Sequence, residues 1–193
     1  MTSQWRTMIP ILFLSISLWA TAGSAEPIER HSTSLMQLLR GIDTVPSPAQ
    51  LSAATAEPID ALFLVATDGN VPLYERRRAV SLLASFPTPQ SEAYLTLLAT
   101  VSVEMPIRWI AAYSYCRGWA VHAPLHVLAF TDWMLRSPAP EEREAVLLAL
   151  RYVSSDAADT LLVQQRQREQ TPRIRGVIDR VMRARQQARR SQR

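Results

Sequence analysis

Apolar residues recur along this chain at one fixed interval of about 33 residues, which is typical of a repeat array. Three sets with this spacing are Leu62, Leu95, Leu128 and Leu161; Leu64, Leu97, Phe130 and Val163; and Ala79, Ala112, Ala145 and Ile178. Three further sets are Leu82, Tyr115, Leu148 and Val181; Leu83, Cys116, Ala149 and Met182; and the aromatic Phe86, Trp119 and Tyr152. In such an array each unit buries its apolar face against its neighbours. The pattern therefore predicts four repeats with one continuous core, from Pro58 toward the C-terminal end.

Each repeat has the pattern of a helix, a turn and a second helix. In the second helices the apolar positions fall at offsets 0, +3, +4 and +7, which lie on one face of an α-helix. We expect first helices at residues 58–66, 91–101, 124–135 and 156–168, and second helices at 73–85, 106–119, 141–153 and 172–187. Prolines fall near the ends of these ranges, where a helix tolerates them. The predicted fold class is all-α, and residues 58–189 form the array.

The segment before the array predicts two short helices that cap its open end. Leu35 and Leu39 belong to a short amphipathic stretch that Gly41 closes, and Ser47 followed by Pro48 is a helix start that runs toward Glu57. Terminal units of repeat arrays commonly act as caps. Residues 26–57 are therefore interpreted as a tether, over 26–33, followed by capping helices, and residues 190–193 as a basic tail.

Residues 1–25 have the pattern of a secretory signal peptide. Arg6 precedes an apolar run over residues 8–20, and small residues follow up to Ala25. An uncleaved membrane anchor is the alternative, but a run of about a dozen apolar residues is short for a bilayer that needs about 20. We predict cleavage near Ala25 and a periplasmic or secreted mature protein.

Charge separates the mature chain into an acidic body and a basic end. Residues 26–163 hold 10 arginines against 15 acidic residues, whereas residues 164–193 hold 10 arginines against 2. A basic end of this kind can contact anionic lipid head groups, and the candidate residues are Arg180, Arg183, Arg185, Arg189 and Arg190. The alternative is a solvated helix end. Because an exported protein rarely meets nucleic acid, we expect no nucleic-acid partner.

No catalytic constellation is visible in the sequence. Cys116 shares its column with apolar residues, so we interpret it as a buried side chain, with a reactive thiol as the alternative. His122 and His126 have the i, i+4 spacing of metal ligands, but Pro124 lies between them and favours a helix start there. We therefore expect no enzyme activity, no cofactor and no metal site.

Residues that break the repeat pattern are the candidates for partner binding. Trp109 and Trp133 occupy positions where the other repeats carry polar residues, and tryptophan is common at binding hot spots. Their alternative role is to cover a local gap in the fold. Arginines recur along the second helices and can meet acidic groups of a partner; they are Arg76, Arg77, Arg108, Arg143 and Arg151. Their alternative role is a solvated face paired with Glu75, Glu142 and Glu144.

The segment over residues 107–112, Ile-Arg-Trp-Ile-Ala-Ala, resembles the Val-Arg-x-x-Ala-Ala segment in the second helix of HEAT-like repeats. Residues 74–80 and 143–146 are looser copies, and the short period is similar to that of phycobilin lyases. The last repeat departs from the pattern at Ile178 and Asp179. Residues 123–129 are similar to the ankyrin signature, but the other repeats lack it.

The HEAT-like resemblance implies a right-handed α-solenoid of stacked antiparallel helix pairs that holds a partner protein, with the second helices on its concave side. We therefore expect an exported, non-catalytic scaffold for protein–protein interaction. The alternatives are a peripheral envelope module that uses the arginine-rich end and a lyase-like protein that handles a chromophore.

Export is directly testable. We expect N-terminal sequencing of the exported protein to find a mature chain that begins near Glu26, because the small residues up to Ala25 fit a signal peptidase site. Recovery of the chain with Met1 intact would contradict this prediction.

Overall fold

The computed structural model describes residues 31–191, which form α-helices and one 3₁₀ helix without any strand. The first six helices are α1 (Thr33–Arg40), α2 (Pro48–Ala54), α3 (Pro58–Thr67), α4 (Leu73–Leu83), α5 (Pro89–Val101) and α6 (Met105–Trp119). The remaining elements are α7 (Pro124–Met134), α8 (Pro140–Ala149), the 3₁₀ helix η1 (Leu150–Tyr152), α9 (Asp156–Arg168) and α10 (Pro172–Ser191). The expected all-α fold class is confirmed for this part of the chain.

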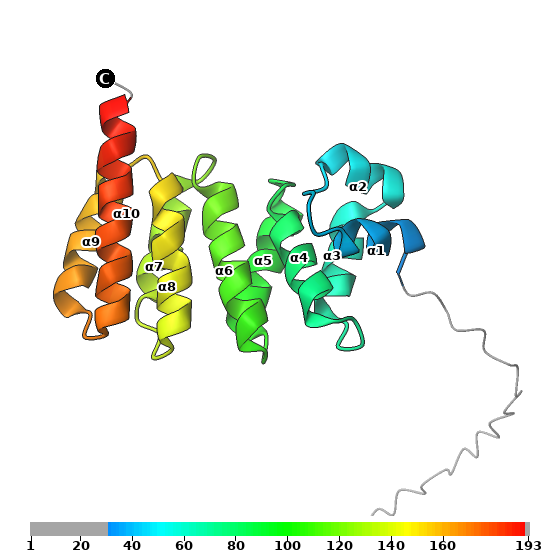
Figure 1. Cartoon of the computed structure of the whole chain (residues 1–193), viewed down its shortest axis with the longest axis horizontal. Helices are drawn as coiled ribbons and strands as arrows, with labels where there is room; N and C mark the ends of the chain where they lie inside the picture. The colour runs from blue at the N-terminus through cyan, green and yellow to red at the C-terminus, as the bar shows by residue number, and fades with distance from the viewer. Residues whose placement is uncertain (1–30, 192–193) are drawn as a thin grey trace, which may run out of the picture.

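The helices form two layers that run along the molecule (Figure 1). The second helices α4, α6, α8 and α10 contact one another in succession and make one layer. The first helices α3, α5, α7 and α9 make the other, and each packs against the second helix that follows it. At the N-terminal end α1 packs on α4, and α2 bridges α1 and α3. The two short helices therefore cover the N-terminal end of the two layers.

Local sequence explains where most helices begin. Proline occupies the first turn of seven of them, where its missing N–H group has no helical partner to lose (α2, α3, α5, α6, α7, α8 and α10). The start of α5 lies earlier than expected, at Pro89, because Thr88 and Ser91 form a capping box. The helix expected over 141–153 ends at Ala149 and continues as η1.

The spacing of the helix pairs is not uniform. The second helices begin at Leu73, Met105, Pro140 and Pro172, so the interval between the second and third starts is longer than the other two. Loops of different length therefore connect pairs that pack in similar ways. A single fixed period averages over these differences and aligns some positions that are not equivalent in space.

Four of the six apolar columns contribute to the core along their whole length. The column that begins at Leu62 is buried at Leu95 and Leu128, and the three columns of the second helices that begin at Ala79, Leu82 and Leu83 contain only buried or partly buried residues. The aromatic column is buried at Trp119 but reaches the surface at Tyr152, where the helix has ended.

The column that begins at Leu64 is not core, which corrects the sequence interpretation. Leu64 is 54% exposed, Leu97 46% and Val163 42%, while Phe130 is partly buried. Each lies two positions after a residue of the buried column. Residues i and i+2 point to nearly opposite sides of an α-helix. This column therefore forms an apolar stripe on the outer side of the first helices.

The residues next to the N-terminal tether are fixed to the fold. His31 Nε2 lies 2.9 Å from Asp68 Oδ2, and the Ser32 hydroxyl donates to the carbonyl oxygen of Ala54. Residues 31–33 are thus part of the folded body, which corrects the last part of the expected tether over 26–33. The predicted signal peptide and the rest of the tether lie outside the described residues. Within residues 31–191, no helix is both long and apolar enough to cross a membrane.

Two leucines of α5 provide a matched test of this core. Leu95 is fully buried, whereas Leu97 in the same helix is 46% exposed. We expect Leu95→Ala to lower the free energy of unfolding by about 2–5 kcal/mol and Leu97→Ala by less than about 1 kcal/mol, because an exposed side chain leaves no cavity. Urea denaturation of both variants measures the difference. Equal losses would show that the assigned faces of α5 are wrong.

Candidate functional site

A groove of about 480 Å³ lies on the layer of second helices, between α6, α8 and the start of α10. Its floor and walls are Trp109, Ile110, Tyr113, Glu141, Glu144, Ala145, Leu148, Arg151 and Arg173. Ligand pockets commonly have volumes of about 300–1,000 Å³ with a mainly apolar lining. This groove unites two residues that the sequence singled out, Trp109 and Arg151, and it is the candidate functional site.

The middle of the groove is apolar and is built by two neighbouring second helices. Trp109 and Ile110 come from α6, and Ala145 and Leu148 come from α8. The guanidinium of Arg77, on α4, lies 4.6 Å from the centre of the Trp109 ring, as in a cation–π contact. The indole of Trp109 therefore contacts an arginine of the preceding second helix, α4, while it also lines the groove.

One end of the groove carries an acidic cluster that a single arginine balances in part. Glu141 and Glu144 stand on successive turns of α8, and Arg173, from α10, forms ion pairs with both. The Glu141 pair measures 3.7 Å, and the Glu141 side chain remains 45% exposed. Carboxylates in the first turn of a helix also stabilise the helix dipole. With one arginine against two carboxylates, this end of the groove keeps a net negative charge.

The other end of the groove holds an arginine between two tyrosines. Arg151 donates hydrogen bonds to the hydroxyl oxygens of Tyr113 at 3.1 Å and Tyr152 at 2.7 Å, and its guanidinium lies 4.7 Å from the centre of the Tyr152 ring. The pKa of Tyr113 is raised, first by burial and then by its hydrogen bond with Tyr152. Burial also acts to raise the pKa of Tyr152. Its hydrogen bonds with Tyr113 and Arg151 and the charges of Arg151 and Arg117 outweigh burial, so the pKa of Tyr152 is lowered. The three side chains form one polar cluster with excess positive charge.

Three of the predicted partner-binding arginines join neighbouring helix pairs instead of facing open solvent. Arg76 pairs with Glu104, Arg108 with Glu142, and Arg143 with Glu169. Each guanidinium also donates to a carbonyl oxygen near the end of the preceding first helix, on Ala66, Ser102 and Ser137 respectively. In each case the carboxylate comes from a later element of the chain. These arginines therefore act as clamps. Of the carboxylates expected to pair with the arginine face, Glu142 takes part, whereas the other two clamps use Glu104 and Glu169.

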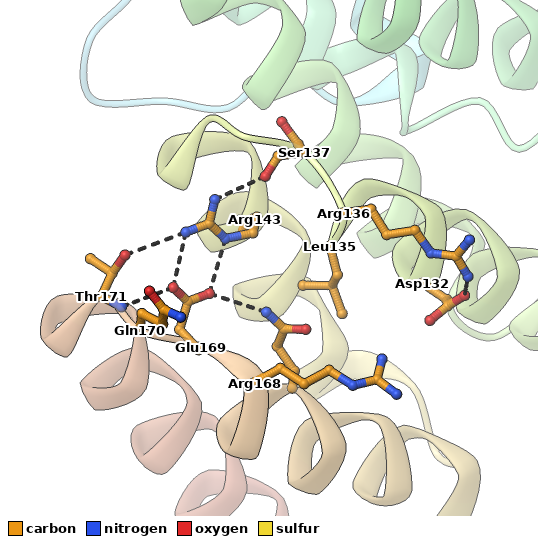
Figure 2. A pocket seen from close by; sticks show the side chains of 10 residues that line it. Asp132, Leu135, Arg136, Ser137, Arg143, Arg168, Glu169, Gln170 and Thr171 are labelled. Atoms are coloured by element: carbon orange, nitrogen blue, oxygen red, sulfur yellow. Dashed lines mark hydrogen bonds and ion pairs between the residues drawn. The ribbon is translucent and has the colours of Figure 1, made fainter.

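Figure 2 shows the clamp of Arg143 in a polar pocket of about 450 Å³. Arg143 points between Ser137 and the carboxylate of Glu169, and Glu169 also accepts from the side chain of Gln165 and the backbone of Thr171. Glu169 is only 4% exposed. Its pKa is lowered to about 2, chiefly by the hydrogen bonds from Arg143. The pocket is thus the surface of a structural ion-pair network.

Trp133 lies on the opposite layer from Trp109. It is 52% exposed on α7 and lines a hollow of about 440 Å³ with residues of α5 and with Phe130. Leu97, from the exposed apolar column, lines the same hollow. The structure therefore separates the two tryptophans, and a single groove does not contain both.

The arginine-rich end is only partly available to a membrane surface. Arg185 is 5% exposed, donates to the backbone carbonyls of Leu150 and Ser155, and pairs with Asp159. Arg189 pairs with Asp156 and Asp159. These contacts attach α10 to the loop before α9, which corrects the assignment of Arg185 to a lipid-facing surface. The exposed candidates that remain are Arg180, Arg183 and Arg190.

The candidates for chemistry are not brought together. Cys116 is fully buried, and burial raises the pKa of its thiol to about 12, so its thiolate is scarce at neutral pH. His122 is exposed in the loop before α7, and His126 is exposed on α7 with its Nδ1 4.0 Å from Glu92. Across residues 31–191, no group of three or more His, Cys, Asp or Glu side chains is placed to hold a metal ion.

Comparisons of the chain with protein-family models, with curated proteins and with solved structures find no match.

The clamp of Glu169 predicts a defined pH dependence. Because the pKa of Glu169 is about 2 in the folded protein and ordinarily 4.5, its stabilisation is present above about pH 4.5 and is lost as the pH falls toward 2. We expect Glu169→Gln to lower the free energy of unfolding at pH 7 by about 3 kcal/mol or more, since it breaks a buried ion pair. Denaturant titrations from pH 7 to pH 2 should show this difference shrinking as the wild-type carboxylate is protonated.

Glu141→Gln is the matched control, because that side chain is exposed and pairs loosely with Arg173. Its effect at pH 7 should stay below about 1 kcal/mol. A loss for Glu169→Gln that is no larger than this control would contradict the clamp.

Proposed function

We propose that this protein is an exported, non-catalytic scaffold of the HEAT-like type, a right-handed α-solenoid that holds a partner protein in the groove of its second helices. The observation that carries this proposal is the groove itself, where an apolar floor on α6 and α8 lies between charged ends. Hot spots of protein interfaces commonly combine such aromatic and arginine side chains.

The arrangement of the helices supports the scaffold class. Four helix pairs follow one another, the second helices form a continuous layer, and arginine clamps bind each pair to the next. In repeat proteins of this kind each unit contacts only its neighbours, which leaves an extended surface for partners. The resemblance around residues 107–112 implies the right-handed sense of the array.

The two alternative functions receive less support from the described residues. A membrane-binding role would rely on basic side chains of α10, and two of its five candidates already form ion pairs within the chain. A lyase-like role would need a reactive group near a cavity, whereas Cys116 is enclosed in the core. The groove, by contrast, combines apolar side chains in its middle with accessible charged side chains at its ends.

The proposal is tested with one tryptophan from each layer. Arg77 stands 32 residues before Trp109, which is the interval between the starts of α4 and α6, and Thr100 stands at the Trp133 position of the preceding repeat. We therefore expect Trp109→Arg and Trp133→Thr to keep the helix content and nearly the same melting temperature. Capture of envelope proteins, identified by mass spectrometry and titrated with the purified partner, measures function. We expect Trp109→Arg to weaken the complex at least about tenfold, because the substitution removes a central anchor of the interface.

Trp133→Thr is the control, because Trp133 lies on the opposite layer. We expect it to bind the partner as the wild type does. The scaffold proposal fails if the wild type captures no partner, or if a well-folded Trp109→Arg variant binds it unchanged.

A further inference from the structure

The end of the groove at Arg151 carries a positive charge that no carboxylate of residues 31–191 balances. Arg76, Arg108 and Arg143 each have a carboxylate partner within the chain. Arg151, by contrast, contacts two tyrosine hydroxyls, and no carboxylate of residues 31–191 lies within ion-pair distance of it. The clamp arginines show how a guanidinium is paired with a carboxylate within this fold, and Arg151 lacks such a partner among the described residues. A guanidinium with two hydroxyl groups beside it matches a carboxylate, which accepts several hydrogen bonds at once.

The length and polarity of the groove suit an extended peptide. From Glu141 to Arg151 the axis of α8 and η1 advances by about 15 Å, which an extended chain spans in about four residues. The acidic end offers the half-exposed carboxylate of Glu141 to hydrogen-bond donors, the middle offers Trp109 and Leu148 to an apolar side chain, and the far end offers Arg151. A fatty acid would use the apolar floor and Arg151 but has no donor for the acidic end.

We propose that the groove binds an extended segment of a partner protein in which an apolar side chain lies on Trp109 and Leu148 and an aspartate or glutamate about two residues further along is received by Arg151, Tyr113 and Tyr152. This proposal rests on the scaffold function above and specifies its ligand. Arg151 is exposed, so the bound chain continues past it into solvent. The carboxylate of the ligand balances the charge of Arg151, which no carboxylate of residues 31–191 balances. Arg151 is therefore the residue that selects acidic segments.

Two short peptides test the selectivity directly. The probes are acetyl-Ala-Leu-Ala-Asp-amide and acetyl-Ala-Leu-Ala-Asn-amide, and the measurement is an NMR titration that follows the indole N–H of Trp109 in the exported protein. We expect the aspartate peptide to bind at least about tenfold more tightly than the asparagine peptide, the difference typical of one charge-assisted hydrogen-bond pair. Equal affinities, or no shift of the Trp109 signal with either peptide, would overturn the proposal.

Matched variants assign the selectivity to its residue. We expect Arg151→Gln to fold normally, because Arg151 is exposed, and to bind the two peptides within about twofold of each other. Arg180→Gln removes the same charge from an exposed position of α10 outside the groove and should keep the tenfold preference. A preference that survives Arg151→Gln overturns the proposal, and so does displacement of the aspartate peptide by vesicles of anionic phosphatidylglycerol.

The outcomes also separate this inference from the scaffold function. If capture of the partner depends on Trp109 but the peptides bind without preference for aspartate, the scaffold function stands and the acidic ligand is wrong. If the aspartate preference depends on Arg151 but no partner is captured through Trp109, the ligand class stands and the scaffold function is wrong.

Discussion

The close packing of the second helices against one another is the constraint on which the rest of the structure depends. These helices carry many small side chains that are fully buried, among them Ala79, Ala111, Ala112 and Ala149. At Gly118 a β-carbon would come within 3.1 Å of the β-carbon of Ala84, so α6 approaches the end of α4 so closely that a side chain there would require a small shift of its neighbour. Small residues of this kind allow neighbouring helices to approach, and the larger side chains are directed toward the first helices or toward the surface.

The arginine clamps follow from this packing. When second helices lie side by side, the loops that precede them come together at one edge of the layer, and their backbone carbonyls lose water. Arg76, Arg108 and Arg143 satisfy those carbonyls and at the same time bind a carboxylate of the next unit. A buried ion pair adds little net stability relative to an apolar pair, but removal of one partner is costly. The clamps therefore fix how one helix pair is oriented on the next.

The groove is the place where the layer is incompletely filled. Between α6 and α8 the side chains of Trp109, Ile110 and Leu148 are only partly covered. Arg151 lies in η1, just after α8 ends, whereas the clamp arginines lie near the starts of their helices. This difference in position explains why Arg151 contacts tyrosine hydroxyls and not a carboxylate of the next unit. It also explains why a ligand that brings a carboxylate would complement this end.

The hydrophobic pattern by itself determined the all-α class, the number and approximate bounds of the helices and the buried face of every second helix. It did so because helix periodicity and proline positions act over a few residues and are visible in one dimension. The break in the pattern at Trp109 also drew attention to the residue that now lines the groove. These features depend on local geometry, which the sequence carries directly.

Tertiary structure alone decided the roles of the charged residues and of the exposed column at Leu64. An alignment at one fixed period places Arg76 with Trp109, whereas the clamps occupy positions 76, 108 and 143 because the loops differ in length. Arg185 belongs to the basic end in sequence, yet it is buried because α10 packs on the loop before α9. Whether an arginine is free or clamped depends on which carboxylate lies beside it, and in the clamps that carboxylate belongs to a later element of the chain. Their meeting is set by how the helices pack, and no local pattern records it.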